Sequence, residues 1–321
     1  MFLDNRTGLD ARLGRGLLFD GIAAFSVGIQ VWYAIEEGRL RRVPAPEGLA
    51  LEPPDVRGAL LWKGTTVSVF GHVPCPTRSP YLTSVTLQVG DTTRRLAVFG
   101  PRRWESRFRG LSASDPEPFE PLPLSWNLAF GGTDHRPPGW DHASRLPHPG
   151  GPVPYVLNPS GQGFIYDVEQ AEGRSLPQIE LPGALVRDPG DRPVPAGFAP
   201  CPNLMALRAA AIVGEGLSLQ SASMREELDK HLDLQHHVAP SCVFPSLAVD
   251  ERITVLGLGT RPVVVVPRCP SSLRLPGRSA RCRLRDVHID ADHAVARLTW
   301  TFGRRFDREA PPRRLTLEMA A

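Results

Sequence analysis

Features that would place a chain of 321 residues in a well-known class are scarce in this sequence. Apolar runs are short: the four valines at 263–266 have the length of a strand and fall far short of a membrane span. The first ten residues contain two acids and no apolar stretch of signal-peptide length. The five cysteines are odd in number and widely spaced, with no CxxC pair: Cys75, Cys201, Cys242, Cys269 and Cys282. We therefore expect a soluble cytoplasmic protein with reduced thiols, without a disulfide framework, a zinc knuckle or a membrane partner.

Lysine is the next scarce residue, since only Lys63 and Lys230 occur among 37 basic residues. The formal net charge of +3 is too small to indicate a nucleic-acid partner. The arginines are scattered along the chain, which is typical of a GC-rich genome. The alternative interpretation is that arginine was selected over lysine for bidentate contacts at interfaces.

Sequence fingerprints of common enzymes are also missing. The chain has no G-x-S-x-G, Walker A, HExxH or G-x-G-x-x-G pattern. The G-x-G at Gly161–Gly163 does not lead into a helix and predicts a turn. We expect a protein without enzymatic activity and without a cofactor.

Proline and glycine are abundant, with 34 and 30 residues, and they divide the chain into short pieces. Alternating β-branched and aromatic residues predict strands at 22–33, 65–70, 82–89, 94–99, 252–258, 263–266, 287–289 and 294–301. Turn residues predict hairpins at 82–99, 252–266 and 287–301. The fold class is mainly β (β-rich α+β), with antiparallel sheets in a sandwich- or barrel-like arrangement and long irregular Gly/Pro-rich loops.

One or two short helices complete this prediction. Ser223 and Glu226 have capping-box spacing, and Leu228 and Leu232 then share one helical face. A second helix is possible over residues 205–213.

The stretch from about residue 116 to residue 200 is rich in glycine, proline and aromatic residues, and predicts irregular structure packed on a sheet. Core positions are favoured for Trp126, Phe130 and Phe164, because aromatic side chains mainly supply buried area. Trp140 lies among prolines and glycine, so we expect it to be exposed. Beside Arg136 and Arg145 it has the composition of an interface hot spot, and Tyr155 is added to this partner-binding set.

A metal site is the main chemical alternative in this stretch. Asp134-His135, Asp141-His142 and His148 supply carboxylates and imidazoles, which suit zinc or a non-haem metal. They occur in a proline-rich loop without strand or helix periodicity to fix their geometry. The competing interpretation is a polar surface loop with a few histidines.

Four motifs in this stretch resemble the DUF2169 family in order and spacing. They are LPLSWNLAFGG at 122–132, NPSGQGF at 158–164, LPQIE at 176–180 and PAGFAP at 195–200. Further similarity comes from Lys63 with GHVP at 71–74, VFGPRRW at 98–104, and RDVHID at 285–290 followed by LTW at 298–300. The resemblance extends over about residues 20–302.

The resemblance implies structural roles for the residues that match its motifs. These are Lys63, Trp104, Trp126, Phe130, Gly131, Gly132, Asn158, Pro159, Gly161, Gly163 and Phe164. The glycines are expected to take backbone conformations closed to other residues. The chain departs from the family pattern at 65–67, near Met205 with Arg208 kept, and at 232–240, where Gln235, His236 and His237 replace expected aromatics.

Family members resemble chaperone-like adaptors that hold a type VI secretion effector, often PAAR-like, and help load it onto the VgrG spike. The resemblance therefore implies a non-enzymatic adaptor formed by one unit over 1–321, with possible halves at 1–125 and 126–302 and a C-terminal tail at 303–321. Two other classes remain open: a metal-dependent hydrolase that uses His135, His142 and His148, and a carbohydrate-binding module that uses Trp140 and Tyr155.

Overall fold

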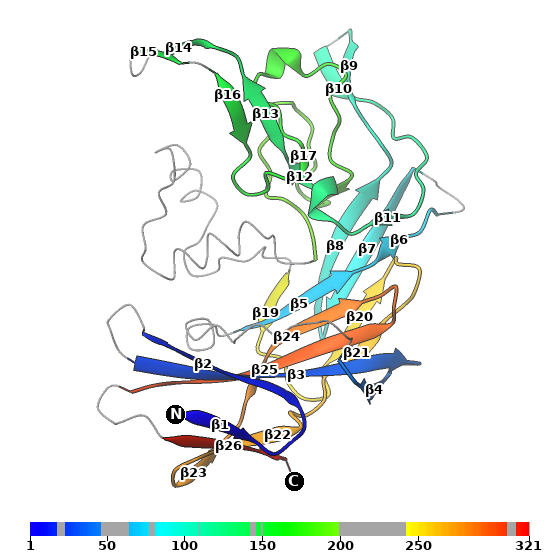
Figure 1. The fold of residues 1–321 in the computed structure, drawn as a ribbon. Coiled ribbons are helices and arrows are strands. Elements are labelled where there is room, and N and C mark those ends of the chain that lie inside the picture. Colours follow the sequence, from blue (N-terminus) through cyan, green and yellow to red (C-terminus); the bar gives the residue numbers. More distant parts are fainter. Residues whose placement is uncertain are drawn as a thin grey trace.

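The computed structural model describes residues 1–17, 23–45, 64–76, 81–108, 110–141, 146–148, 150–198, 242–306 and 313–320. Within them the chain is mainly β, as predicted, and its strands form open sheets. Figure 1 shows a framework of long strands below and a lobe of short strands above. No helix in the described part of the chain is long and apolar enough to cross a membrane.

The largest sheet has seven strands, and the long strand β3 (Ala23–Glu36) is the one that organises it. β3 is rich in β-branched and aromatic residues, and it pairs antiparallel with the whole of β25 (Val295–Arg305). Strands continue from β25 through β24 (Arg283–Asp290) and β5 (Gly64–Phe70) to β19 (Val243–Pro245). On its other side β3 pairs with β2 (Asp10–Leu17) and β4 (Arg39–Val43). The predicted strands at 22–33, 65–70, 287–289 and 294–301 are confirmed.

A second sheet of five strands contains the two other predicted hairpins. Its order is β18 (Ile179–Glu180), β8 (Thr92–Phe99), β7 (Leu82–Val89), β20 (Arg252–Leu256) and β21 (Val263–Val265). The β7–β8 hairpin turns at Gly90, whose φ of 53° suits the tight connection.

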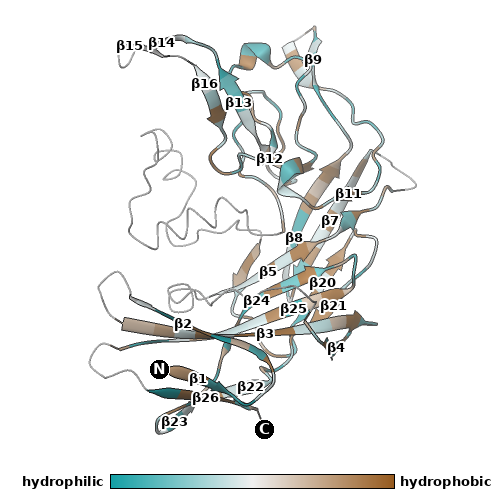
Figure 2. Ribbon diagram, viewed as in Figure 1, coloured by the Kyte–Doolittle hydropathy of each residue, from teal (hydrophilic) through white to brown (hydrophobic). Residues whose placement is uncertain are grey.

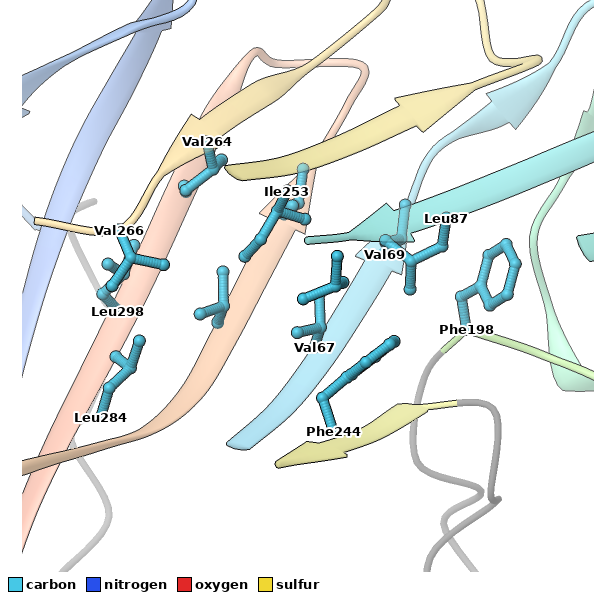
Figure 3. Close-up of a cluster of buried hydrophobic side chains, with 14 of the residues drawn as sticks. Val67, Val69, Leu87, Phe198, Phe244, Ile253, Val264, Val266, Leu284 and Leu298 are labelled. Carbon is cyan, nitrogen blue, oxygen red and sulfur yellow. The ribbon is translucent and has the colours of Figure 1, made fainter. Parts of the chain in front are cut away.

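The two sheets share one hydrophobic core. Figure 3 shows side chains of both sheets meeting, with Val67 and Leu298 from the seven-stranded sheet facing Leu87 and Ile253 from the five-stranded sheet. All four are fully buried. Both sheets contain strands from before residue 100 and strands from residue 243 onward, so both suggested halves contribute to one core.

The C-terminal residues correct one prediction. Residues 303–321 were expected to form a tail, yet β25 continues to Arg305, and Arg314–Met319 form strand β26. β26 lies between β1 (Phe2–Asn5) and β22 (Ser271–Leu275) in a four-stranded sheet that ends at β23 (Arg278–Ala280). Leu315 and Leu317 of β26 are fully buried in the main core, which explains why this segment is a strand.

The upper lobe is formed by the chain between β8 and β18, and its strands are short. They are β9 (Trp104–Arg107), β10 (Gly110–Ala113), β12 (Phe130–Gly131), β13 (Thr133–Arg136), β14 (Gly139–Asp141), β15 (Leu146–His148), β16 (Gly151–Pro154) and β17 (Gln162–Gly163). β6 (His72–Val73) and β11 (Leu122–Pro123) pair where the lobe joins the framework. A second core holds the lobe together. In Figure 2 the strands of the large sheets are mainly apolar, whereas β13 and β26 carry hydrophilic residues.

Only two helical turns occur among the described residues, the 3-10 helices η1 (Trp126–Leu128) and η2 (Val168–Gln170). The helices expected at 205–213 and from Ser223 to Leu232 lie outside the described residues, as do Lys63 and the departures near Met205 and at 232–240.

A buried ion pair joins the lobe to the five-stranded sheet. Arg102 follows β8, and its Nη2 donates hydrogen bonds to Glu180 Oε1 in β18 and to the carbonyl oxygen of Pro177, 2.6 Å away. The side chains of Arg102 and Glu180 are only 7% and 2% exposed. Glu180 Oε2 also accepts a hydrogen bond of 2.6 Å from the backbone N–H of Val186. Each side chain of this pair therefore also binds a main-chain group, Arg102 through Nη2 and Glu180 through Oε2.

We expect Glu180→Gln to lower the free energy of unfolding by about 3–5 kcal/mol, because removing one charge leaves the other buried without its partner. Glu105→Gln is the matched control. Glu105 pairs with Arg103 at 3.5 Å on the surface, where such pairs contribute about 1 kcal/mol or less. Urea denaturation of both variants measures the difference, and equal losses would contradict a structural role for the buried pair.

Candidate functional site

The family-like motifs of the lobe meet around one buried side chain, Asn158, which is 1% exposed. Its Nδ2 donates hydrogen bonds to the carbonyl oxygens of Trp126, 2.7 Å away, and Phe130, 3.1 Å away. Its own carbonyl oxygen accepts from the backbone N–H groups of Gly132 and Gly161, at 2.8 and 3.2 Å. Asn158 thus connects the motif at 122–132 with the motif at 158–164.

The glycines of these motifs are required by the close approach of the backbone. Gly131 has a φ of 146°, and a Cβ there would collide with the carbonyl oxygen of Asn158. A Cβ on Gly161 would collide with the Asn158 side-chain amide. The expected backbone conformation is therefore present at Gly131, Gly132 and Gly163, which have positive φ, whereas Gly161 is constrained only by the lack of space for a Cβ.

Aromatic side chains form the second core beside Asn158. The Phe130 and Tyr155 rings make an edge-to-face contact at 4.9 Å, and Phe164 lies 5.4 Å from Tyr155. Trp104 is 1% exposed in the same core, and Trp126 packs on it half-buried. The core positions predicted for Trp126, Phe130 and Phe164 agree with this packing.

Tyr155 is a correction to the predicted partner-binding set. It is only 3% exposed, and its hydroxyl lies 3.0 Å from the carbonyl oxygen of Pro193, to which it donates a hydrogen bond. A buried tyrosine is stable when its hydroxyl finds such a partner. The ring therefore fills the core and is not available to a partner or to a sugar.

A polar pocket of about 310 Å³ opens beside this core. Its lining comes from both glycine motifs and from the segment after η2: Gly131, Gly132, Thr133, Gly161, Gln162, Gly163, Phe164, Ile165, Gly173, Arg174 and Ser175. The backbone N–H groups of Gly132, Gly161 and Phe164 already donate to carbonyl oxygens within the lobe. Arg174 is the one charged side chain of this lining, so the pocket suits polar segments of a partner better than apolar ones.

Asp134 holds Arg174 in place next to the pocket. Its Oδ1 accepts a 2.7 Å hydrogen bond from Arg174 Nη2, and its Oδ2 accepts a 2.8 Å bond from the backbone N–H of Tyr166. Burial raises the pKa of Asp134, but the hydrogen bonds from the Tyr166 and His135 backbones and from Arg174 outweigh it and lower the pKa below its usual value. Asp134 is thus a structural anion and not a proton donor.

The remaining interface candidates lie on one hairpin. β13 pairs with β16 and β14 pairs with β15 in a single continuous register, so the described residues of the segment 133–154 form one long two-stranded arm. Figure 1 shows β14 and β15 at its far end. Trp140 lies in β14 opposite Pro147, and Arg136 is half-buried, with its guanidinium 5.8 Å from the centre of the Tyr166 ring. Arg145 lies outside the described residues.

The metal-site candidates belong to the same arm. His135 is exposed in β13, and His148 lies in β15, while His142 lies outside the described residues. Among the described residues there is no group of three or more His, Cys, Asp or Glu side chains placed to hold a metal ion.

The sequence motifs contain Arg102 and Glu180, but no role was predicted for either residue, and Asp134 was considered only as a candidate metal ligand. Arg102 and Glu180 stand in two of the family-like motifs, VFGPRRW and LPQIE. A charged residue in each of two otherwise apolar motifs is the signal that would have indicated a buried pair.

Asn158→Ala is expected to destabilise the protein, because two carbonyl oxygens lose their donor at a cost of about 1–3 kcal/mol each. Asn127→Ala removes the same amide from an exposed position in η1 and should change stability by about 0.5 kcal/mol or less. Thermal and urea denaturation of the two variants provide the comparison. An Asn158→Ala protein as stable as the control would refute the anchoring role of this amide.

Asp134→Asn should lower stability by about 1–2 kcal/mol at pH 7, since it weakens charge-assisted hydrogen bonds of which one partner is exposed. A carboxyl whose pKa is lowered by folding stabilises fully above its unfolded pKa, and this contribution is lost as the pH falls through the folded value. The difference between wild type and variant should therefore shrink below about pH 4. Urea denaturation at pH 7, 5 and 3 measures it, and a difference that stays constant with pH would exclude the charge as its cause.

Comparison with known proteins identifies a family but no individual related protein or structure. No curated protein and no solved structure matches the chain. The family model described as "Uncharacterized protein conserved in bacteria (DUF2169)" matches residues 55–301, a range that contains the lobe, its glycine motifs and most of both large sheets. The chain therefore belongs to the DUF2169 family.

Proposed function

We propose that this protein is a non-enzymatic, cytoplasmic adaptor that binds a type VI secretion effector and helps load it onto the VgrG/PAAR spike. The observation that carries the proposal is that the polar side chains of the family-like motifs bind groups of the protein itself. Asn158 and Glu180 each bind the protein's own main chain, and Arg102 binds both Glu180 and a carbonyl oxygen. Residues used in this way stabilise a surface for recognition.

The arm at 133–154 supports a recognition role. A two-stranded hairpin that stands apart from a sheet has little stability of its own in water. Trp140 and Pro147 lie in its strands, and Pro137 and Pro138 lie between β13 and β14. Proline and tryptophan suit a contact surface that loses little entropy when it binds. We infer that a partner protein covers this arm.

Co-purification from the native host tests the proposal. The chain is tagged, and proteins recovered with it are identified by mass spectrometry; we expect an effector encoded nearby, with or without VgrG. Trp140→Ala should reduce the recovery of the effector by about tenfold, the loss typical of an interface hot spot. Tyr81→Ala is the matched control, because Tyr81 is an exposed aromatic residue, 46% accessible, next to β7 of the framework.

Two outcomes would overturn the proposal. Stoichiometric zinc in the purified protein, without effector or VgrG, would favour a metal-dependent hydrolase that uses the arm histidines. Retention on glycan resins that depends on Trp140, again without effector, would favour a carbohydrate-binding module.

A further inference from the structure

A concentration of unbalanced positive charge lies outside the lobe, in the chain that forms β22 and β23 and then enters β24. The segment 268–285 contains six arginines and no acidic residue. It forms β22, a turn at Pro276 and Gly277, and β23, and then enters β24. We call residues 268–283 the arginine hairpin. It lies at the opposite end of the molecule from the arm (Figure 1).

Most arginines of this hairpin have no acidic partner within the described residues. Arg274 is the exception, because its Nε lies 2.5 Å from Glu318 Oε2 on β26. The unpaired arginines are exposed: Arg268, Arg278, Arg281 and Arg283. Four exposed guanidinium groups on one short hairpin create a local positive potential that the protein's overall charge of +3 does not indicate.

The hairpin also supplies β23, an edge strand of the four-stranded sheet. β23 pairs with β22, with Leu273 opposite Ala280, and no other described strand pairs with β23. An edge strand presents backbone N–H and C=O groups to which an extended chain can add. Arg278 lies on this edge strand, and Arg281 and Arg283 follow it directly in the chain. These arginines repel a second copy of the same basic strand and attract an acidic one, so the edge is selective.

We propose that the arginine hairpin docks an extended acidic segment of a partner protein, which adds as a strand beside β23. The open edge supplies hydrogen bonds to the partner's backbone, and Arg278, Arg281 and Arg283 bind its Asp and Glu side chains. The inference rests on the proposed function only in taking the partner to be a protein.

Other polyanions fit this surface less well. The described residues of the arginine hairpin contain no aromatic side chain on which nucleic-acid bases would stack. Leu273 and Leu275 are buried, so the hairpin offers no large apolar side chain for insertion into a lipid surface. Among polyanions, only an acidic extended chain can use both the arginine charges and the open edge of β23.

The test uses the full chain and three fluorescent ten-residue peptides, with fluorescence anisotropy as the readout. The first peptide alternates Glu with Thr or Val, the second has Gln in place of Glu, and the third has Pro at alternate Thr and Val positions. The first should bind best. The Gln peptide lacks charge and the Pro peptide lacks backbone donors, so each should bind at least about tenfold more weakly.

Charge reversal locates the binding site on the protein. The combined change Arg278→Glu, Arg281→Glu and Arg283→Glu should weaken binding of the first peptide by about tenfold or more. The control carries the same charge change on three exposed arginines elsewhere, Arg95→Glu, Arg252→Glu and Arg261→Glu, and should stay within about twofold of wild type. If thermal unfolding shows that the reversed protein is not folded, the milder triple Arg→Gln variant replaces it.

Several results would overturn the docking proposal. Equal binding of the Pro peptide would show electrostatic attraction without strand addition, and equal loss in both triple variants would show a response to net charge alone. Tighter binding of single-stranded DNA or of anionic phosphatidylserine vesicles, lost in the hairpin variant, would assign the surface to those partners.

Co-purification separates this inference from the proposed function. An effector that is still recovered with the hairpin variant would refute the docking site and leave the adaptor role intact. Peptide binding that follows all the expectations, without any effector or VgrG recovered from the host, would refute the adaptor role and leave the docking site intact.

Discussion

The buried pair of Arg102 and Glu180 is the constraint on which the arrangement of the lobe depends. Two charges removed from water are tolerated only when hydrogen bonds satisfy both of them. Here the guanidinium also stacks on the Phe99 ring at 3.8 Å, and the carboxylate accepts from the Val186 backbone. Because Arg102 follows β8 and Glu180 lies in β18, the pair fixes both points at which the lobe's chain leaves and re-enters the five-stranded sheet. Together with the β6–β11 pairing, this pair therefore holds the lobe, with its second core and its arm, against the framework.

The framework was largely predictable because its signals are local. The hairpin at 82–99 combines alternating apolar residues with a Gly90-Asp91 turn, and such a pattern specifies its own pairing. No comparable sequence pattern indicates which strands pair when they are far apart in the chain. β24 lies parallel to β5 across more than 200 residues of sequence, and β26 was taken for a tail. Its alternation, with Leu315 and Leu317 inward, covers only six residues, and the partner strands β1 and β22 are needed to make it a strand.

In the candidate site, too, features set by neighbouring residues were predictable from the sequence, and contacts between residues far apart in the sequence were not. The glycine motifs predicted the unusual backbone seen at Gly131 and Gly163, because glycine is selected for conformations that a Cβ forbids. Tyr155 was assigned to a surface because composition does not reveal that its hydroxyl meets a carbonyl oxygen 38 residues away. The pair of Asp134 and Arg174 was missed for a similar reason, since 40 residues without periodicity separate the two side chains.

An adaptor needs one surface for its cargo and a second for the assembly that receives it. The arm carries Trp140 and prolines, so its chemistry favours apolar contact, whereas the arginine hairpin favours acidic strands. The two surfaces lie at opposite ends of the molecule and are joined by the packed core of the two large sheets, with Arg102 and Glu180 holding the lobe in place (Figure 1). Two partners bound at these ends would not compete for space. If both proposals hold, the rigid β framework sets the distance and orientation between cargo and spike, and catalysis is not needed for that task.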